Sequence, residues 1–459
     1  MSVRSIDPRT GAVIKEMPCS SKADVRSALD KARVAQRSWS SLSANERIEV
    51  LRQAEALFQK DKESMIDLIQ SEGGFPRTEI VGAFAGAMKG VEYYADICLR
   101  KQPPRIDLDQ VSWPNTEVRV EYVPHGVIGH IGIWNYPFWQ TMITAIPALM
   151  AGNAVVFKPS EHTTLTGLRI AETFMKAGLP EGVFTVLVGG KEIGEEMVRS
   201  DFDAIVFTGG LDTGLSILHT SGVKPLILEL SGNDPGIVCS DANIEQAARG
   251  IANGTFGHGG QVCIRVKRLY VTESISGPFI KEFLQVVDRI DVREKVGPLI
   301  REEARAKVHR SVNALIANGA KLLRGGEYVD GPGFYYKPTV LLIENGDSID
   351  LGEEIFGPVC PIVIVKDEEE AVRMANESRF GLGASVWTSD PEKGRKIASK
   401  LEAGTVWVNE CGRTLTGGEN FHGWKSSGIA TSQDRYSMFL KKRTLIQHTT
   451  CEPREHWMK

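Results

Sequence analysis

The pattern of apolar and polar positions changes character near residue 126. Before that point it is mainly helical: Ser43 and Glu46 have the spacing of a capping box, and apolar residues then recur at helical intervals as far as Phe58. Residues 117–122 alternate polar and apolar side chains, which is typical of a half-exposed strand. The first part of the chain therefore predicts helices followed by one outlying strand.

From residue 126 onward, short apolar runs alternate with amphipathic segments. We expect strands at 127–133, 154–157, 183–188 and 204–207, with helices at about 164–177 and 192–200 between them. A second series of strands and helices covers 236–238, 243–257, 268–272, 277–289, 301–318, 340–343, 359–365 and 406–409. Strands that alternate with helices form parallel βαβ units. The pattern thus predicts an α/β fold of two domains that meet near residue 232.

The composition narrows the class of protein. With 459 residues, 42% of them hydrophobic, the chain can bury a large core without disulfide or metal staples. Its 54 Lys and Arg residues against 58 Asp and Glu leave a net charge of −4, so no basic surface is expected to attract nucleic acid or an anionic membrane. The N-terminus lacks the apolar core of a signal peptide, and prolines and asparagines interrupt the most apolar stretch, 131–157. We therefore expect a cytoplasmic protein with neither a nucleic-acid nor a membrane partner.

The seven cysteines indicate a reducing compartment. None belongs to a Cys-x-x-Cys pair, and an odd number cannot all pair within one chain. The nine histidines show no metal-ligand spacing, so no metal site is expected. The sequence also lacks the loop motifs of serine hydrolases and P-loop NTPases. The remaining question is whether one of the thiols carries out chemistry.

Three positions offer groups that suit chemistry at a carbonyl carbon. Cys263 follows Gly259 and Gly260, where a thiolate can attack while its own amide faces the developing oxyanion. Glu229 lies inside an apolar run, where desolvation favours a general base, and Asn135 ends a buried strand, where its amide can donate to an oxyanion. Each has an ordinary structural alternative: a buried cysteine, a strand-end glutamate and a turn-forming asparagine.

Two loops suit a nucleotide. Gly209 and Gly214 follow a strand and open a helix, so free amides at the helix N-terminus can face a pyrophosphate, although the spacing is not that of the dinucleotide fingerprint. Lys158 and Glu161 follow another strand end and can hydrogen-bond ribose hydroxyls. A tight turn and a solvated charge pair are the respective alternatives.

Six segments, most of which carry these candidates, occur in one order and at consistent spacing. They are 134–137, 158–161, 207–209, 229–230, 260–263 and 353–358. As a set they resemble the NAD(P)-dependent aldehyde dehydrogenase superfamily over essentially the whole chain. The resemblance implies two Rossmann-like open-sheet domains, one for the cofactor and one catalytic, plus a small β oligomerisation arm. The expected division is 1–102 with 125–231 for the cofactor domain, 232–430 for the catalytic domain, and 103–124 with 431–459 for the arm.

The resemblance also implies a reaction, of the EC 1.2.1 type. Cys263 would be the nucleophile, Glu229 the general base, and Asn135, with the backbone amide of Cys263, the oxyanion hole. The aldehyde would pass through a thiohemiacetal and a thioester on the cysteine, with hydride transfer to NAD(P). Because family members that form acyl-CoA typically lack the glutamate base, its presence favours release of the free acid. A non-catalytic family member and an acyl-CoA-forming enzyme are the competing hypotheses.

The family pattern assigns the remaining site residues. Those expected at the cofactor are Trp134, Lys158, Ser160, Glu161, Gly209, Gly210, Gly214, Leu230, Glu354 and Phe356. NAD is favoured because Glu161 repels the 2′-phosphate of NADP, but Lys158 acts in the opposite sense, so NADP is not excluded. A homodimer or a homotetramer is expected.

The substrate pocket is less defined. The residues expected to line it are Trp139, Gln140, Ile143, Val262, Ile264, Arg413 and Phe421. We expect Arg413 to pair with the carboxylate of an ω-semialdehyde such as succinic semialdehyde. Uncharged aliphatic or aromatic aldehydes are the competing class, suggested by Trp134, Tyr136 and Trp139.

Four positions depart from the family pattern. Gly210 and Ser231 stand where a serine and a glycine are usual, and His258 replaces an asparagine five residues before the nucleophile. His422 replaces a glycine near the C-terminus. None removes a catalytic group, but together they predict altered cofactor geometry and substrate choice.

Overall fold

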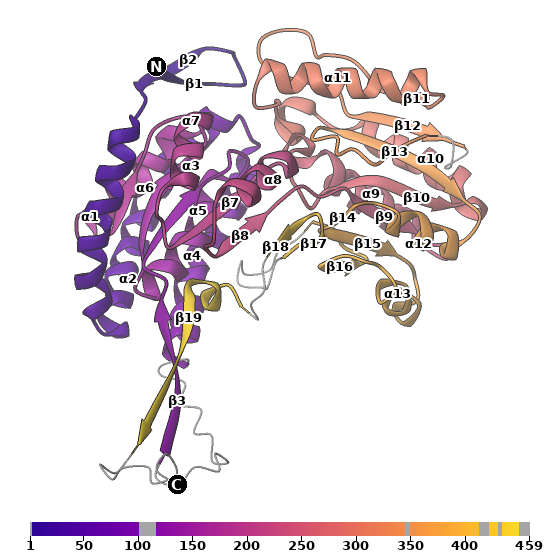
Figure 1. Cartoon of the computed structure of the whole chain (residues 1–459). Helices are drawn as coiled ribbons and strands as arrows, with labels where there is room; N and C mark the ends of the chain where they lie inside the picture. Colours follow the sequence, from indigo (N-terminus) through magenta and orange to yellow (C-terminus); the bar gives the residue numbers. More distant parts are fainter. Residues whose placement is uncertain (1, 101–115, 345–348, 413–421, 430–433, 449–459) are drawn as a thin grey trace.

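Two open, mostly parallel sheets dominate the protein (Figure 1). The computed structural model describes residues 2–100, 116–344, 349–412, 422–429 and 434–448. The predicted α/β class, with two Rossmann-like sheets and a small β arm, is confirmed. Among the described residues, no helix combines the length and the apolar character needed to cross a lipid bilayer.

The N-terminal region forms a hairpin and four helices. The first helix lies against the first sheet, and the other three pack on one another and on helices that flank that sheet. The hairpin strands are β1 (Ser2–Ile6) and β2 (Val13–Pro18), and the helices are α1 (Lys22–Ser41), α2 (Ala44–Lys60), α3 (Lys62–Gly73) and α4 (Arg77–Arg100). Ser43 and Glu46 form the predicted capping box at the start of α2, and Ser21 with Asp24 forms a second one at α1. Each box satisfies amides that a helix N-terminus would otherwise leave unpaired.

The first sheet has six strands in the order β18-β8-β7-β4-β5-β6. Its strands are β4 (Val127–Ile131), β5 (Ala154–Lys158), β6 (Phe184–Val186), β7 (Ala204–Thr208), β8 (Leu226–Glu229) and β18 (Gly428–Ile429). Helices α5 (Pro137–Met150), α6 (Thr164–Lys176), α7 (Lys191–Arg199) and α8 (Leu211–Thr220) connect or flank them. All neighbours are parallel except β18, which pairs antiparallel with β8 and comes from the range expected for the catalytic domain.

The second sheet has seven strands in the order β11-β12-β13-β10-β9-β15-β16. Its strands are β9 (Asp234–Val238), β10 (Val266–Thr272), β11 (Lys321–Arg324), β12 (Thr339–Ile343), β13 (Val359–Val365), β15 (Gly383–Trp387) and β16 (Thr405–Val408). Its helices are α9 (Ile244–Phe256), α10 (Glu273–Asp288), α11 (Glu302–Ala317), α12 (Glu368–Asn376) and α13 (Pro391–Ala398). The short elements η1 (Gly257–Gly260), η2 (Val292–Val296), β14 (Phe380–Gly381) and β17 (Trp424–Lys425) lie between them. β11, β15, α12 and α13 were not among the predicted elements.

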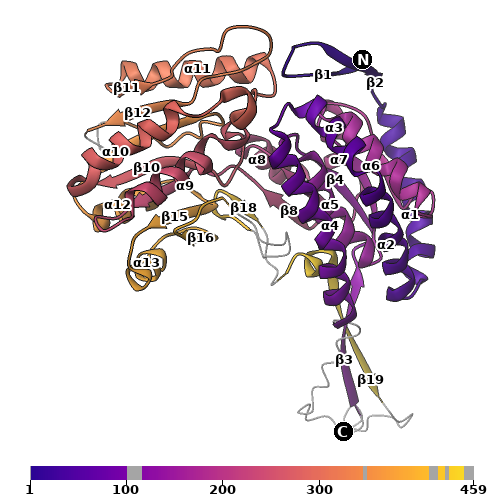
Figure 2. The same cartoon turned by 180° about the vertical axis from the view of Figure 1, so that it is seen from behind.

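A two-stranded arm extends from the first domain (Figures 1 and 2). It pairs β3 (Thr116–Pro124) with β19 (Leu440–His448) antiparallel, which extends the predicted strand at 117–122. The short helix η4 (Tyr436–Phe439) precedes β19, and its Tyr436 and Phe439 side chains are buried in the core of the first domain. The base of the arm is therefore anchored by packing, while the pair of strands projects outward.

Candidate active site

A cavity of about 900 Å³ lies between the two sheets. Its wall is formed by the segments that follow β4, β7 and β8, by the first half of α4 and by the segment that precedes β10. In an open parallel sheet, ligands bind beyond the carboxyl ends of the strands. This cavity is therefore the candidate active site within the described part of the chain.

All three predicted catalytic residues, Asn135, Glu229 and Cys263, line this cavity. The predicted cofactor and substrate residues that line it with them are Trp134, Trp139, Gln140, Gly209, Gly210, Leu230, Val262, Ile264, Glu354 and Phe356. Because they come from both sheets, neither domain alone supplies the wall.

Four predicted cofactor residues lie outside the cavity wall, namely Lys158, Ser160, Glu161 and Gly214. Lys158 ends β5, and its buried ammonium donates to two backbone carbonyls at 2.8 and 2.9 Å and lies 3.8 Å from the Glu161 carboxylate. Burial lowers the pKa of Lys158. A Cβ atom on Gly214 would lie 2.4 Å from the Leu230 side chain, so this glycine allows close packing of α8.

The predicted substrate residues divide into three groups. Trp139, Val262 and Ile264 line the cavity, as does Gln140, whose amide donates to neighbouring side chains. Ile143 is 2% exposed and is not part of the cavity wall, because α5 is buried on nearly all sides. The remaining two, Arg413 and Phe421, lie outside the described residues.

The segment before Cys263 has an unusual backbone. His258, Gly259 and Gly260 have φ values of 59°, 66° and 66°, in the left-handed region that favours glycine. A Cβ atom on Gly260 would lie 2.1 Å from the carbonyl oxygen of Gly357. The glycines that marked this motif in the sequence are thus required by backbone conformation and by a close approach.

The side chain of His258, a residue with a left-handed backbone, is buried in an aromatic stack. Its ring lies between Phe75 and Tyr136, with ring centroids 3.9 and 4.4 Å away and nearly parallel planes. Its Nε2 lies 2.7 Å from the backbone oxygen of Asn135, which only accepts, so Nε2 carries the hydrogen. Burial lowers the pKa of His258 to about 4, so the ring is neutral at neutral pH. This departure from the family pattern therefore links the segment before Cys263 to Asn135.

Asn135 is also held through its side chain. Its Nδ2 donates to the backbone oxygen of Gln261 at 2.8 Å. The Gln261 side chain is itself held, because it donates to Pro298 O at 3.0 Å and accepts from Ile300 N at 2.9 Å. An amide nitrogen carries two hydrogens, so Asn135 retains a second donor in the cavity wall.

The Cys263 thiol is protonated at neutral pH in the free protein. Burial raises its pKa to about 12, and the nearby carboxylates Asp234, Glu354 and Glu229 act in the same sense, while Lys267 opposes them. The Lys267 ammonium donates to the carbonyl oxygen of Cys263 at 2.8 Å and lies 3.2 Å from Glu354. Formation of a thiolate here requires a proton acceptor.

Glu229 ends β8 and is buried with partners on both carboxylate oxygens. Its Oε2 accepts a 2.7 Å hydrogen bond from Gln140 Nε2, which also donates to Thr208 Oγ1 at 2.8 Å. Its Oε1 forms an ion pair with the guanidinium of Arg435, a residue with a 2% exposed side chain. Arg435 lies 206 positions from Glu229 and belongs to none of the motifs, so no pattern in the sequence points to it.

The loop after β7 fits a dinucleotide. Gly210 precedes α8 and has no side chain to cap it; the Leu211 amide lies 3.4 Å from Ser231 Oγ, and the following amides of the first turn are available to a phosphate. A Cβ atom on Gly210 would meet nothing within 4 Å, which leaves open space at this position. Trp134 and Phe356 form an edge-to-face pair 5.6 Å apart in the cavity wall, an apolar surface that suits a planar ring.

Comparison with known proteins agrees with this geometry. The sequence model of the aldehyde dehydrogenase family matches residues 1–447. The chain is 35% identical to a betaine aldehyde dehydrogenase of Bacillus subtilis (strain 168) over 440 residues, 93% of this chain and 88% of that protein. It is 34% identical to the NAD(P)+ succinate semialdehyde dehydrogenase Sad of Escherichia coli (strain K12) over 414 residues, 88% of this chain and 89% of that protein.

Solved structures give the same result. Lactaldehyde dehydrogenase from Escherichia coli superposes with a TM-score of 0.92 at 30% identity, over 98% of this chain and 96% of that chain. A betaine aldehyde dehydrogenase variant from Staphylococcus aureus, in complex with NAD+, superposes with a TM-score of 0.94 at 29% identity, over 99% and 96%.

Proposed function

The chain belongs to the aldehyde dehydrogenase family, and we propose that it oxidises an aldehyde to the free carboxylic acid, with NAD or NADP as electron acceptor. The observation that carries this proposal is that Cys263, Asn135 and Glu229 line one cavity next to a loop that fits a dinucleotide. The named dehydrogenase relatives support it.

The residues suggest an order of events. The Cys263 thiol gives its proton to solvent water, and its sulfur bonds to the aldehyde carbon while the carbonyl π electron pair moves to oxygen. The second hydrogen of the Asn135 amide, together with the backbone amide of Cys263, donates to the resulting oxyanion. When bound, the nicotinamide ring supplies the acceptor for the hydride of the substrate carbon. This leaves a thioester on Cys263. Glu229 then takes a proton from water as the water oxygen bonds to the thioester carbon, and the carbon–sulfur bond breaks to release the acid.

The direct test is an aldehyde panel assayed for NADH and NADPH formation, with wild-type protein and Cys263→Ala. We expect turnover by the wild type alone, with no need for coenzyme A. Absence of turnover with both cofactors would favour the non-catalytic alternative, and strict dependence on coenzyme A would favour acyl-CoA formation.

For the substrate, we propose an ω-semialdehyde such as succinic semialdehyde. The Sad relative carries that name, and the Arg265 guanidinium lines the cavity two residues after the nucleophile. Arg265 is already paired with Glu79 at 3.3 Å, so we assign the substrate carboxylate to Arg413. Arg413→Ala should raise the KM for succinic semialdehyde and leave that for butanal unchanged. An unchanged KM for the semialdehyde would refute this assignment.

A second substrate class has support of its own. Tyr136 and Trp139 line the same cavity, and aromatic rings suit an uncharged or a cationic aldehyde. The Bacillus subtilis relative is a betaine aldehyde dehydrogenase. A higher kcat/KM for betaine aldehyde or benzaldehyde than for succinic semialdehyde would select this class.

We propose a homodimer or homotetramer that forms through the arm. Ile446 and Leu445 on β19 are 56% and 39% exposed, so the arm presents apolar side chains to a partner copy. Light scattering of wild type and of Ile446→Asp tests this. For localisation we propose the cytoplasm, because the six cysteines among the described residues are free thiols and Cys263 must stay reduced.

A further inference from the structure

We propose that Arg435 is a positioning residue for the hydrolytic step. Its guanidinium pairs with the Glu229 carboxylate and holds it in one orientation, so it sets the rate and the pH dependence of thioester hydrolysis. Acylation of Cys263 does not depend on it. The inference rests on the proposed roles of Cys263 and Glu229 and adds a residue that the sequence motifs do not contain.

The contact itself is buried and specific. The side chains of Arg435 and Glu229 are 2% and 8% exposed, and the guanidinium meets Oε1 of the carboxylate. Gln140 holds the other oxygen at 2.7 Å. A carboxylate that has a donor on each oxygen has few orientations left, and one of the two donors here carries a full positive charge.

Arg435 is held in place from its own side of the contact. It directly precedes η4, where the Ser437 amide donates to Asp434 Oδ1 at 2.8 Å. The Tyr436 hydroxyl lies 3.2 Å from Cys98 Sγ, and Asn153 Nδ2 donates to the Phe439 carbonyl oxygen at 3.0 Å. The short helix is thus fastened to the core of the first domain, and Arg435 is not a mobile surface side chain.

The surrounding charges leave Glu229 as the counter-ion of Arg435. The other titratable groups that act on Arg435 are the Tyr94 phenol and the His130 ring. Burial lowers the pKa of His130 to about 3, with the Arg435 charge acting in the same sense, so that ring is neutral. On the cavity side, Glu229 faces the Cys263 thiol, which is protonated in the free protein. Removal of Arg435 would therefore leave a buried carboxylate uncompensated.

This loss has a defined consequence for hydrolysis. In that step the water oxygen bonds to the thioester carbon, one water proton moves to Glu229, and the carbon–sulfur bond breaks with its electron pair returning to sulfur. Only a charged carboxylate can accept the proton. A buried carboxylate without its counter-ion becomes protonated at higher pH, so hydrolysis fails at a pH where the wild type still works.

The experiment uses p-nitrophenyl acetate with the full chain and without cofactor. Cys263 sulfur displaces p-nitrophenolate and leaves an acetyl thioester, so the initial burst measures acylation and the later steady rate measures hydrolysis. The variants are Arg435→Met, Arg435→Gln, which keeps a neutral donor, and Arg435→Lys, which restores the charge. Burst amplitude per protein counts the folded, reactive sites in each.

We expect bursts of wild-type amplitude in the folded variants. In Arg435→Met and Arg435→Gln, the acid limb of the steady rate should move up by about one pH unit or more, which lowers hydrolysis about tenfold below the limb. Arg435→Lys should restore most of the wild-type profile.

Two different failures are distinguishable. If the wild type and the neutral variants share one acid limb, or if Arg435→Lys shifts as far as Arg435→Gln, the inference about Arg435 is overturned. If Arg435→Met does not fold, the comparison of Arg435→Gln with Arg435→Lys decides. If the wild type releases no p-nitrophenolate, or Cys263→Ala releases it as fast as the wild type, the proposed function fails instead.

Discussion

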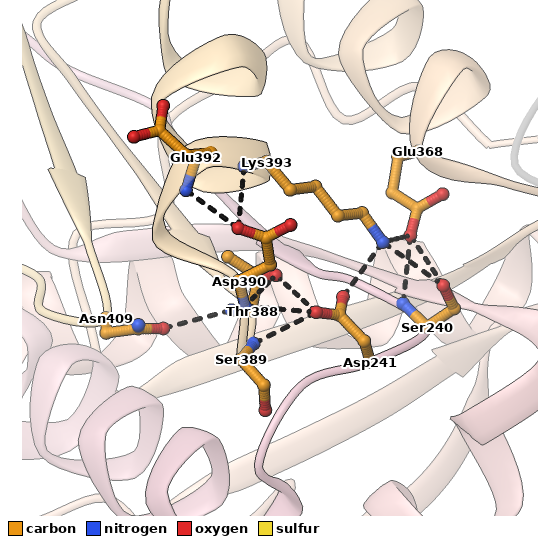
Figure 3. Close-up of polar contacts among 9 residues, drawn as sticks. All are labelled: Ser240, Asp241, Glu368, Thr388, Ser389, Asp390, Glu392, Lys393 and Asn409. Carbon is orange, nitrogen blue, oxygen red and sulfur yellow. Dashed lines mark hydrogen bonds and ion pairs between the residues drawn. The ribbon is translucent and has the colours of Figure 1, made fainter.

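The two sheets share a parallel topology, but the carboxyl ends of their strands are put to different uses. In the first sheet, β4, β7 and β8 lead into Asn135, Gly209 and Glu229, which line the cavity. In the second sheet, the carboxyl ends of β9 and β15 lead into a group of polar side chains that bond to one another (Figure 3). We call Asp241, Glu368, Thr388 and Lys393 the closed network. Cys263, the proposed nucleophile, lies at the other end of the second sheet, because it precedes β10.

Lys393 is the centre of that network. Its ammonium lies 2.8 Å from Asp241 and 2.6 Å from Glu368 (Figure 3). Asp241 also accepts from Thr388 Oγ1 at 2.7 Å, and Asp390 caps the helix that carries Lys393. The charged groups at these strand ends are therefore paired with one another.

The comparison shows that strand ends make a binding site only when their polar groups keep capacity for a ligand. Cys239, Asp241 and Glu368 lie close enough together to hold a metal ion. Lys393 already supplies a positive charge to both carboxylates, so we interpret the cluster as structural. In the first sheet, the Asn135 amide keeps a free donor, and Gly210 brings no capping side chain to the N-terminus of α8.

The largest predicted effect separates the two regions by their cysteines. Cys263→Ser should lower kcat/KM by more than about a thousandfold, because an alcohol is a far weaker nucleophile without an adjacent base. The matched change Cys239→Ser, at the closed network, should leave kcat/KM unchanged. Equal losses in the two variants, measured by steady-state kinetics, would show that turnover does not depend on the cavity cysteine more than on the cysteine at the closed network.

Removal of the oxyanion donor should have the next largest effect. Asn135→Ala should lower kcat by roughly 100–1000-fold, the usual range for one such donor. Stopped-flow absorbance of reduced cofactor measures it. A similar loss in His258→Asn, which restores the usual residue of the family pattern, is not expected, since that side chain also carries a donor for the Asn135 carbonyl. A wild-type kcat for Asn135→Ala would contradict its role.

A smaller effect concerns cofactor choice at the end of β5. Glu161→Gln removes the charge expected to repel a 2′-phosphate, so the ratio of kcat/KM for NADP over NAD should rise about tenfold, or about 1.4 kcal/mol. Glu369→Gln, an exposed residue of α12 beside the closed network, is the control and should not change the ratio. An unchanged ratio in Glu161→Gln would show that the Glu161 charge does not govern selectivity.

The smallest effect on catalysis is expected at Lys393. Lys393→Met leaves two carboxylates without their shared cation, so the free energy of unfolding should fall by about 1–3 kcal/mol while kcat/KM is unchanged. Lys396→Met on the same helix should change stability by less than about 0.5 kcal/mol. Urea unfolding with parallel kinetics measures both. A loss of activity without a loss of stability would give the network a functional role.

The same network predicts a pH dependence. Burial alone would raise the pKa values of Asp241 and Glu368, but hydrogen bonds from Lys393 and neighbouring groups lower each to about 2. Because both folded values lie below the unfolded ones, this stabilisation is present above about pH 4.5 and is lost as the pH falls toward 2. The unfolding free energy of Lys393→Met should depend less steeply on pH in that window. Equal slopes for the two proteins would refute this assignment.

Much of the architecture was predictable because local pattern encodes it. The capping box at Ser43, the apolar runs of β4, β5 and β7, and the strand at 117–122 all appear in the structure near their expected bounds. Ordered motifs likewise predicted that Asn135, Glu229 and Cys263 would serve one site, and all three line one cavity.

What could not be predicted depends on contacts between distant segments. Arg435 meets Glu229 from 206 positions away, and β18 joins the first sheet beside β8 although most of its neighbours in sequence belong to the second. Gln140 was expected at the substrate, yet its amide donates to Glu229 and Thr208. Residue type and spacing carry no information about which partner a buried polar group will find.

The central claim is that an acyl group is carried by Cys263 and released through Glu229. Glu229→Gln, incubated with aldehyde and NAD and then quenched, should carry one acyl group on the peptide that contains Cys263, detected by mass spectrometry, while the wild type accumulates less. Formation of reduced cofactor by Glu229→Gln with no acyl group on that peptide, or with the group on another cysteine, would contradict the account.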